Sequence, residues 1–324
     1  MKTSVLIYIQ LSIIAILLIF FLVMHISIKQ HRRVRKIGYS ILLKDKFPTD
    51  TVWDEYFSKI PNQRYKAVIH GKDNISSKIN PDCTTLLRST FVPSIETKWG
   101  HYTIVKAQIA TIRELLKDPE IDRICFISGN CIPLRSFYDS VKILEKCNKS
   151  IFTLFNMTVR FPRFEELLKY GIHPDDVGFH HQWCIIRRDH AQLLVDKFDE
   201  YIEWFKEIHA PDECAIMTVL QHYKVPKDQL KLVSCLNKVN GEDGMQGTTF
   251  TQWHDINYRY HLAVDKLSVS SPKIYKNISY EEMMHVINKS YCIFGRKFTN
   301  ETNVIMWDET RVNISDFLRN EHIM

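Results

Sequence analysis

Short apolar runs alternate with amphipathic helical patterns along this chain, and that alternation limits the fold more than any other feature. Runs typical of strands cover residues 37–43, 65–70, 91–92, 123–128, 151–155, 182–186 and 290–294. Helical patterns cover residues 49–60, 102–116, 137–147 and 187–205, whereas 221–250 carry neither pattern. Strands and helices that alternate in this way indicate an α/β domain. We therefore expect a mixed, mostly parallel sheet flanked by helices, with an irregular segment at 221–250.

The first residues have a different character from the rest. Val5–Met24 is apolar at nearly every position, and as a helix it spans about 30 Å, the thickness of a bilayer core. A cleaved signal peptide would have a shorter apolar region that ends in small residues, whereas basic residues at 29–36 follow this run. We predict one transmembrane helix anchored in a lipid bilayer. Residues 1–36 are then the anchor with its basic flank, and residues 37–324 form one soluble domain.

Two features give opposite orientations for this anchor. The basic flank at 29–36 favours the cytosol for the soluble domain. Against this, the chain contains seven N-x-S/T sequons, at Asn74, Asn148, Asn156, Asn277, Asn288, Asn300 and Asn313. Chance would give about two, so the excess indicates glycosylation in a lumen. We expect a type II membrane protein of the Golgi or endoplasmic reticulum with a lumenal domain.

The composition argues against several partners. The net charge of +6 is mild, and no zinc-finger spacing or RNA-binding signature is present, so we expect no nucleic acid. None of the eight cysteines forms a C-x-x-C pair, and the chain has no phosphate-binding glycine motif. The chain also lacks D-x-D, the motif with which many nucleotide-sugar enzymes hold Mn²⁺ or Mg²⁺. We expect no bound metal and no cofactor.

An acidic pair follows the sequence His209–Ala210–Pro211. Asp212 is a good N-cap, and Glu213 opens a helix whose apolar residues share one face. A carboxylate in the first helical turn lies near the mouth of a fold rather than in its core. The alternative is that Glu213 only complements the helix dipole, which stabilises a helix by about 0.3–1 kcal/mol.

Four other groups of residues stand at the ends of predicted elements. They are Trp99 at a helix start, Asn130 after a buried strand, Gln182–Trp183 after two histidines, and Arg296–Lys297 after the last strand. Each has a structural alternative: a buried Trp, a plain turn, solvated or hydrogen-bonded histidines, and a solvated strand end. Arg296 and Lys297 would also suit a diphosphate, because guanidinium groups fork phosphate oxygens and ammonium groups act as point charges.

These segments together resemble the core-2/I-branching β-1,6-N-acetylglucosaminyltransferase family, and its plant branch in particular. Six segments carry the resemblance, in the order of the family: LLKDKFPTDTVWDEYF, STFVPSIETKWGHYTIVKAQ, FISGNCIPLRSF, HHQWCIIRRDHAQLLV, APDECAIMTVL and CIFGRKF. They extend from about Leu42 to Phe298. The resemblance implies a GT-A-like fold, a lumenal catalytic domain and a metal-independent reaction with a UDP-sugar donor and a glycan or glycoprotein acceptor.

The resemblance also assigns roles to individual residues. It places the catalytic base at Glu213 beside Asp212, and a diphosphate-binding lysine at Lys297 next to Arg296. A second family cation has Lys273 as its nearest candidate. A donor-side aspartate of the animal enzymes is not reproduced, and Asp73 serves only if its loop shifts. The family motif K-G-S before Gln182 is replaced by Phe179–His181.

We predict an inverting glycosyltransferase that moves GlcNAc, or alternatively xylose, from a UDP-sugar to a hydroxyl group. Glu213 is the predicted base, and Arg296, Lys297, Lys273 and Asp73 are the predicted donor-binding residues. Asp212, Trp99, Gln182, Trp183 and Asn130 are predicted to bind substrate. Because of the two departures from the family pattern, the alternative is a membrane-tethered glycan-binding protein without catalytic activity.

Overall fold

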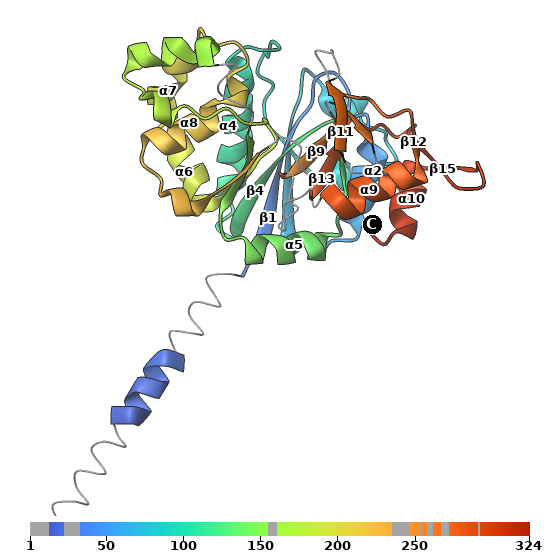
Figure 1. Cartoon of the computed structure of the whole chain (residues 1–324), viewed down its shortest axis with the longest axis horizontal. Helices are drawn as coiled ribbons and strands as arrows, with labels where there is room; N and C mark the ends of the chain where they lie inside the picture. The colour runs from blue at the N-terminus through green and yellow to red at the C-terminus, as the bar shows by residue number, and fades with distance from the viewer. Residues whose placement is uncertain are drawn as a thin grey trace, which may run out of the picture.

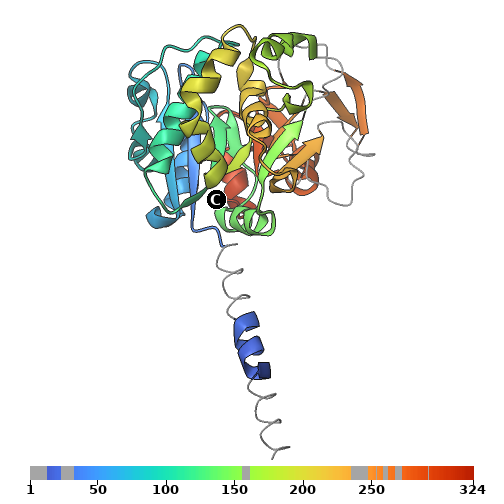
Figure 2. The ribbon, with the colours of Figure 1, turned by 90° about the vertical axis from the view of Figure 1, so that its left-hand side faces the viewer.

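The computed structural model describes residues 13–22, 33–154, 161–234, 247–252, 254–257, 262–266, 272–290 and 292–324. In Figure 1, a central sheet separates two groups of helices: α4, α6, α7 and α8 lie on one side, and α2, α9 and α10 on the other. Figure 2 looks onto the first group, with the teal and yellow helices lying across the sheet.

The central sheet has seven strands in the order β3-β2-β1-β4-β7-β6-β8. Their bounds are β1 Lys36–Leu42, β2 Tyr65–His70, β3 Thr90–Phe91, β4 Ile121–Ser128, β6 Ser150–Leu154, β7 Ile185–Arg187 and β8 Leu230–Ser234. Strand β7 runs antiparallel to both of its neighbours, whereas all other pairs are parallel. The prediction of a mixed, mostly parallel sheet with flanking helices is confirmed.

Both faces of the sheet are covered, because successive strand residues point to opposite sides. On β4, Ile124 and Phe126 pack into the core beneath α4 (Thr103–Leu116), α6 (Arg188–Asp196) and α8 (Ala215–His222). Cys125 and Ile127 of the same strand pack on the other face, with aromatic residues of α2 (Asp50–Ser58) and apolar residues of α5 (Phe137–Lys146). A strand buried on both faces explains why RICFIS is apolar without alternation.

The C-terminal part adds a third core beside α2. It contains the helices α9 (Tyr280–Ser290) and α10 (Ile314–Asn320) and two small sheets, with strand orders β12-β14-β15 and β5-β13-β9. Their strands are β5 Cys131–Pro133, β9 Thr249–Thr251, β12 Asn277–Ser279, β13 Phe294–Arg296, β14 Asn303–Ile305 and β15 Arg311–Asn313. Strands β10 (His254–Asn257) and β11 (Leu262–Lys266) form a separate pair. Pairing of β13 with β5 joins this part to the segment that follows β4.

Three expectations from the sequence were wrong in detail. Residues 221–250 include the edge strand β8, which pairs with β6 along five residues from Ser150↔Leu230 to Leu154↔Ser234. The helical pattern at 187–205 is broken, because α6 ends at Asp196 and a short α7 (Phe198–Tyr201) and a 3₁₀ turn follow. Asp212 is no N-cap, since α8 begins at Ala215 after the separate 3₁₀ turn Pro211–Glu213.

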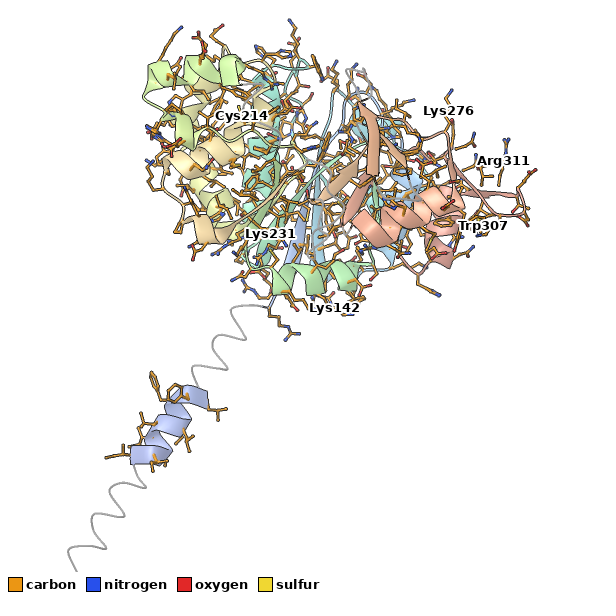
Figure 3. The ribbon with its side chains drawn as sticks, viewed as in Figure 1. Lys142, Cys214, Lys231, Lys276, Trp307 and Arg311 are labelled. Carbon is orange, nitrogen blue, oxygen red and sulfur yellow. The ribbon has the colours of Figure 1, made fainter. Side chains whose placement is uncertain are left out.

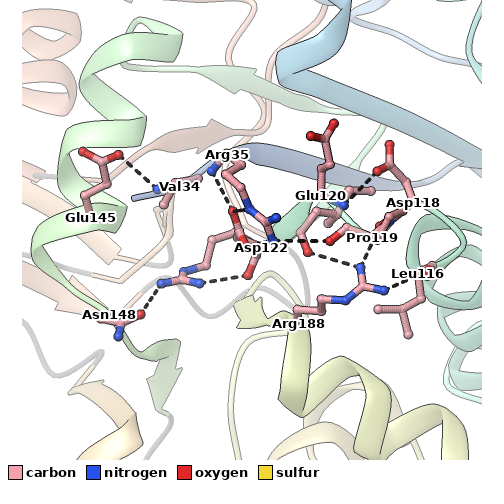
Figure 4. A network of polar contacts seen from close by, with 12 residues as sticks. Val34, Arg35, Leu116, Asp118, Pro119, Glu120, Asp122, Glu145, Asn148 and Arg188 are labelled. Carbon is pink, nitrogen blue, oxygen red and sulfur yellow. Dashed lines mark hydrogen bonds and ion pairs between the residues drawn. The ribbon is translucent and has the colours of Figure 1, made fainter. Parts of the chain in front are cut away.

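The start of the soluble part is fixed by polar contacts at the amino ends of β1 and β4 (Figure 4). The backbone N–H of Val34 donates to Glu145, Arg35 binds Asp122, and Lys36 pairs with Asp118 at 2.6 Å. Upstream, residues 13–22 are helical, and the rest of the Val5–Met24 run lies outside the described residues. Among the described ranges, no helix has the length and apolar character needed to cross a membrane.

Candidate active site

Glu213 lies in a tight turn that Arg163 holds in place. The guanidinium group of Arg163 donates to the carbonyl oxygens of His209 and Ala210 at 2.6 and 2.7 Å, and to the Glu213 carboxylate at 3.1 Å. Ala210 has a φ of 50°, which is unusual for a residue with a side chain. The Glu213 side chain keeps 26% exposure, so it is accessible from solvent while paired.

A second loop, carrying Trp99, docks against this turn. The carbonyl oxygen of Gly100 accepts a hydrogen bond from Ala210 N at 2.7 Å. Gly100 has a φ of 73°, and a Cβ atom there would lie 2.5 Å from the His209 ring, so the close approach requires glycine. Trp99 is 79% exposed and meets His209 edge to face at 5.2 Å. The alternative of a buried Trp is therefore wrong, and Trp99 lies open beside the loop that carries Glu213.

The two histidines lie behind Glu213 and are buried rather than solvated. His180 N donates to the Glu213 carbonyl oxygen at 2.7 Å, and His181 N donates to Thr153 O at 2.8 Å. Burial lowers the pKa of His180 to about 4 and that of His181 to about 3, so both rings are neutral at pH 7. Within the described ranges, no cluster of three or more His, Cys, Asp or Glu residues suited to a metal ion occurs.

Arg296 packs on Trp183, which follows these histidines by two positions. Its guanidinium group lies 3.6 Å from the centre of the Trp183 ring, a cation–π contact. Burial lowers the pKa of Arg296 to about 10, so it remains charged at neutral pH. Burial, and then the charge of Arg296, also lower the pKa of Lys297. Arg296 is therefore not the solvated end of a strand, and Lys297 is half-buried beside it.

Asn130 fixes the position of this cationic pair. Phe298 N donates to Asn130 O at 3.0 Å, and Asn130 Nδ2 donates to Phe298 O at 3.1 Å. The pair thus lies at the carboxyl end of β4, the edge at which α/β sheets bind ligands. Asn130 thus positions this segment through its backbone carbonyl group and one of its two amide N–H donors.

A chain of contacts joins the acid to the cations. It runs from the Glu213 carbonyl group to His180, through the neighbouring His181 to Trp183, and from Trp183 to Arg296. Figure 3 shows Cys214, the residue after Glu213, among the helices on one side of the central sheet and Lys276 on the other side, both at the opposite end of the domain from Lys142 on α5. The structure thus brings Glu213, Gln182–Trp183 and Arg296–Lys297 to one end of the fold.

The remaining predicted residues lie at different distances from this centre. Lys297 N donates to Lys273 O at 3.4 Å, so Lys273 adjoins the cationic pair. Its ammonium group binds Glu282 at 2.8 Å. Asp73 is exposed in the loop after β2. Arg163 was missed, because an arginine fifty residues before Glu213 has no local pattern that marks it.

Comparisons with known proteins agree with this picture. The family model described as "Branch: Core-2/I-Branching enzyme" matches residues 37–286. The glycosyltransferase BC10 of Oryza sativa subsp. japonica is 21% identical over 309 residues, which cover 84% of this chain and 76% of that protein.

Solved structures give only distant matches. TarS of S. aureus aligns with a TM-score of 0.34 and 13% identity, covering 61% of this chain and 35% of TarS. Glucosyl-3-phosphoglycerate synthase from Mycobacterium tuberculosis, solved with Mn²⁺ and UDP, aligns with a TM-score of 0.30 and 9% identity, covering 62% of this chain and 70% of that chain. Since the family model matches more than half of the chain and covers five of the six sequence segments, all but CIFGRKF at residues 292–298, the chain belongs to the Core-2/I-Branching enzyme family of glycosyltransferases.

Proposed function

We propose that this protein is a metal-independent, inverting glycosyltransferase with a GT-A-like fold. It transfers GlcNAc, or alternatively xylose, from a UDP-sugar to a hydroxyl group of a glycan or glycoprotein. The observation that carries the proposal is the arrangement of one accessible carboxylate, Glu213, and two cations, Arg296 and Lys297, at the same end of the sheet. An acid and fixed positive charges are the two elements that a metal-free displacement at a sugar phosphate needs.

In the proposed reaction, the acceptor oxygen attacks the anomeric carbon while Glu213 takes its proton. The bond from the anomeric carbon to the diphosphate oxygen breaks on the opposite face, and UDP leaves with the bonding electrons. Arg296 and Lys297 stabilise the charge that grows on the diphosphate. Lys273 also binds the diphosphate once its ion pair with Glu282 breaks. Asp73 contacts the donor if its loop moves.

The acceptor side of the proposal uses the surface around Glu213. Trp99 is an open aromatic face beside the base, and Gln182 is a partly exposed amide next to the buried Trp183. Asp212 and Asn130 support this site from within. Arg163 orients the Glu213 carboxylate. The acceptor hydroxyl then replaces the hydrogen bond from Arg163 to that carboxylate.

The direct test is a panel of UDP-sugars given to the full chain in detergent. Thermal shift identifies the donor, because a ligand that binds only the folded state raises the melting temperature. Transfer to an acceptor panel of p-nitrophenyl glycosides and a serine peptide then gives the reaction. If no UDP-sugar stabilises the protein and none is transferred, the proposed function is wrong.

Metal independence leads to a separate prediction. In the proposed reaction, Arg296 and Lys297 supply the positive charge that a metal ion supplies in other enzymes. We expect EDTA to leave the transfer rate unchanged within about twofold. Removal of a catalytic metal would instead cost several kcal/mol of transition-state stabilisation and lower the rate strongly. A loss of activity that Mn²⁺ restores would contradict the prediction.

If the domain is lumenal, the exposure and contacts of each sequon asparagine predict whether it carries a glycan. Asn277 is exposed on β12. Asn300 Nδ2 donates to Asp50, and the Asn313 side chain caps α10 through Ser315 N while donating to Asn300 O. Glycosylation at the last two sites would disrupt these contacts. Glycopeptide mass spectrometry of protein from a eukaryotic host should find Asn277 occupied and Asn300 and Asn313 unmodified. A protein without any glycan would contradict the lumenal, type II orientation.

The second candidate function is a membrane-tethered glycan-binding protein. One observation favours it: a hydrogen bond from Arg163 at 3.1 Å already occupies the Glu213 carboxylate. Titration with UDP separates the two functions. A glycosyltransferase binds UDP through Lys297, whereas a protein that binds the p-nitrophenyl glycosides but no UDP supports the second candidate.

A further inference from the structure

Asp212 is a buried acid with one carboxylate oxygen that has no hydrogen-bond donor among the described residues. It lies beside Glu213 in the turn Pro211–Glu213 and is only 5% exposed. Its Oδ1 atom is closed off from solvent and accepts no hydrogen bond from the described part of the chain. Burial, and then the charge of Glu213, raise the pKa of Asp212 to about 7, and the charge of Arg163 acts in the opposite direction. Such a group costs stability, so its place beside a candidate base points to function.

Asp50 shows how the same fold accommodates a structural aspartate. It is also 5% exposed, but its oxygens accept hydrogen bonds from Thr51 N, Asn80 N and Asn300 Nδ2. Three donors offset the cost of burying that carboxylate. Asp212 has the same burial, but its Oδ1 atom receives no hydrogen bond from the described residues.

The charges around Glu213 suggest what Asp212 does. Arg163 Nη2 lies 3.1 Å from Glu213 Oε2, so its positive charge acts directly on the proposed base. A negative charge on the neighbouring residue acts in the opposite direction. The other titratable or charged groups on this loop and on the segments packed against it include His209, Cys214, His101, His180 and His181, and Lys106 and Arg113 of α4. Burial keeps His180, His181 and the Cys214 thiol neutral at pH 7, since it lowers the pKa of each histidine and raises that of Cys214.

We propose that Asp212 is a positioning residue whose carboxylate offsets the charge of Arg163 and so enables Glu213 to accept the proton of the acceptor hydroxyl. This role rests on the proposed glycosyltransferase function. Asp212 itself takes no proton from the substrate, and its charge acts through Glu213. Because Asp212 ionises near pH 7, transfer rises with pH through that range as Asp212 acquires its charge.

The Asp212→Asn substitution tests this role, with Asp50→Asn as a control of equal burial. In Asp212→Asn, we expect transfer at pH 8 to fall about tenfold, because one unit of opposing charge is lost near the base. The rise of activity through pH 7 should also disappear. Unchanged turnover with an unchanged pH profile would overturn the proposal.

Stability separates this role from a structural one. The folded-state pKa of Asp212 is raised, so the stability associated with its protonated form is complete below about pH 4 and is lost as pH rises through about 7. At pH 8, Asp212→Asn should therefore melt at a higher temperature than the unsubstituted protein, whereas Asp50→Asn should melt at a lower one. A misfolded or destabilised Asp212→Asn protein would contradict the proposal.

Carboxyl NMR tests the coupling without an activity assay. With ¹³C-labelled aspartate, Asp212 should titrate near pH 7, and its midpoint should fall in Glu213→Gln, because the charge of Glu213 helps to raise it. An unchanged midpoint would overturn the coupling even in an active enzyme. If the protein transfers no sugar at all, the proposed function fails, and the NMR and melting experiments still decide whether the two acids interact.

Discussion

Glu213→Gln is expected to lower the transfer rate by about 10²–10⁴, the usual contribution of a general base. The amide of glutamine has nearly the shape of the carboxylate but cannot take the acceptor proton. The fold should survive, because Arg163 also binds the carbonyl oxygens of His209 and Ala210 and the glutamine oxygen still accepts from it. The measurement is the initial rate of sugar transfer at saturating donor, with a melting curve to verify folding.

Glu203→Gln is the matched control for this variant. Glu203 lies in the segment just before the same loop and pairs with Lys206 at the surface, with 53% of its side chain exposed. Its substitution should leave transfer unchanged. The assigned role of Glu213 is wrong if Glu213→Gln transfers sugar at nearly the original rate. Equal losses in both variants would indicate a general effect of removing an acid.

Lys297→Ala is expected to reduce kcat/KM for the UDP-sugar by about 10²–10³, the effect of removing one preorganised group that stabilises developing charge. Lys297 follows Arg296, whose position the Trp183 ring and the two Asn130–Phe298 hydrogen bonds fix. A cation held in this way needs little reorganisation when the diphosphate becomes more negative. The loss should appear in kcat as well as in binding, because the charge to be stabilised increases in the transition state.

Lys276→Ala controls for the general loss of a lysine. Lys276 lies in the same C-terminal part of the fold but is exposed near β12, as Figure 3 shows. Its loss should change neither UDP affinity nor turnover. If Lys297→Ala binds UDP as tightly as the unsubstituted protein and turns over at the same rate, the diphosphate site lies elsewhere.

Sequence patterns predicted the central sheet because its strands are short, apolar and separated by clear helices. Strand β8 was not predicted because its sequence LKLVS is short and lies at the sheet edge, where Leu230 is buried but Leu232 is exposed. The break after Asp196 was missed because apolar residues continue at helical spacing into Tyr201 and Phe205, and both are buried although the helix changes direction. Periodicity reports burial more directly than it reports backbone continuity.

The site was predictable only where its residues share a motif. Asp212–Glu213 and Arg296–Lys297 are adjacent in sequence, so local patterns and the family resemblance found them. Arg163 was not found, because its contact with Glu213 depends on tertiary folding across fifty residues. The exposure of Trp99 also depends on a tertiary feature, the docking of Gly100 against His209, for which the sequence provides only a glycine.

The central claim is that Glu213 and Lys297 lie on two sides of one donor site. A crystal structure of the protein with bound UDP tests it most directly. The account predicts diphosphate oxygens within hydrogen-bonding distance of Lys297 Nζ, with the open side of the β-phosphate directed toward Glu213. UDP bound at another part of the surface, or a Glu213 carboxylate that faces away from the bound nucleotide, would contradict it.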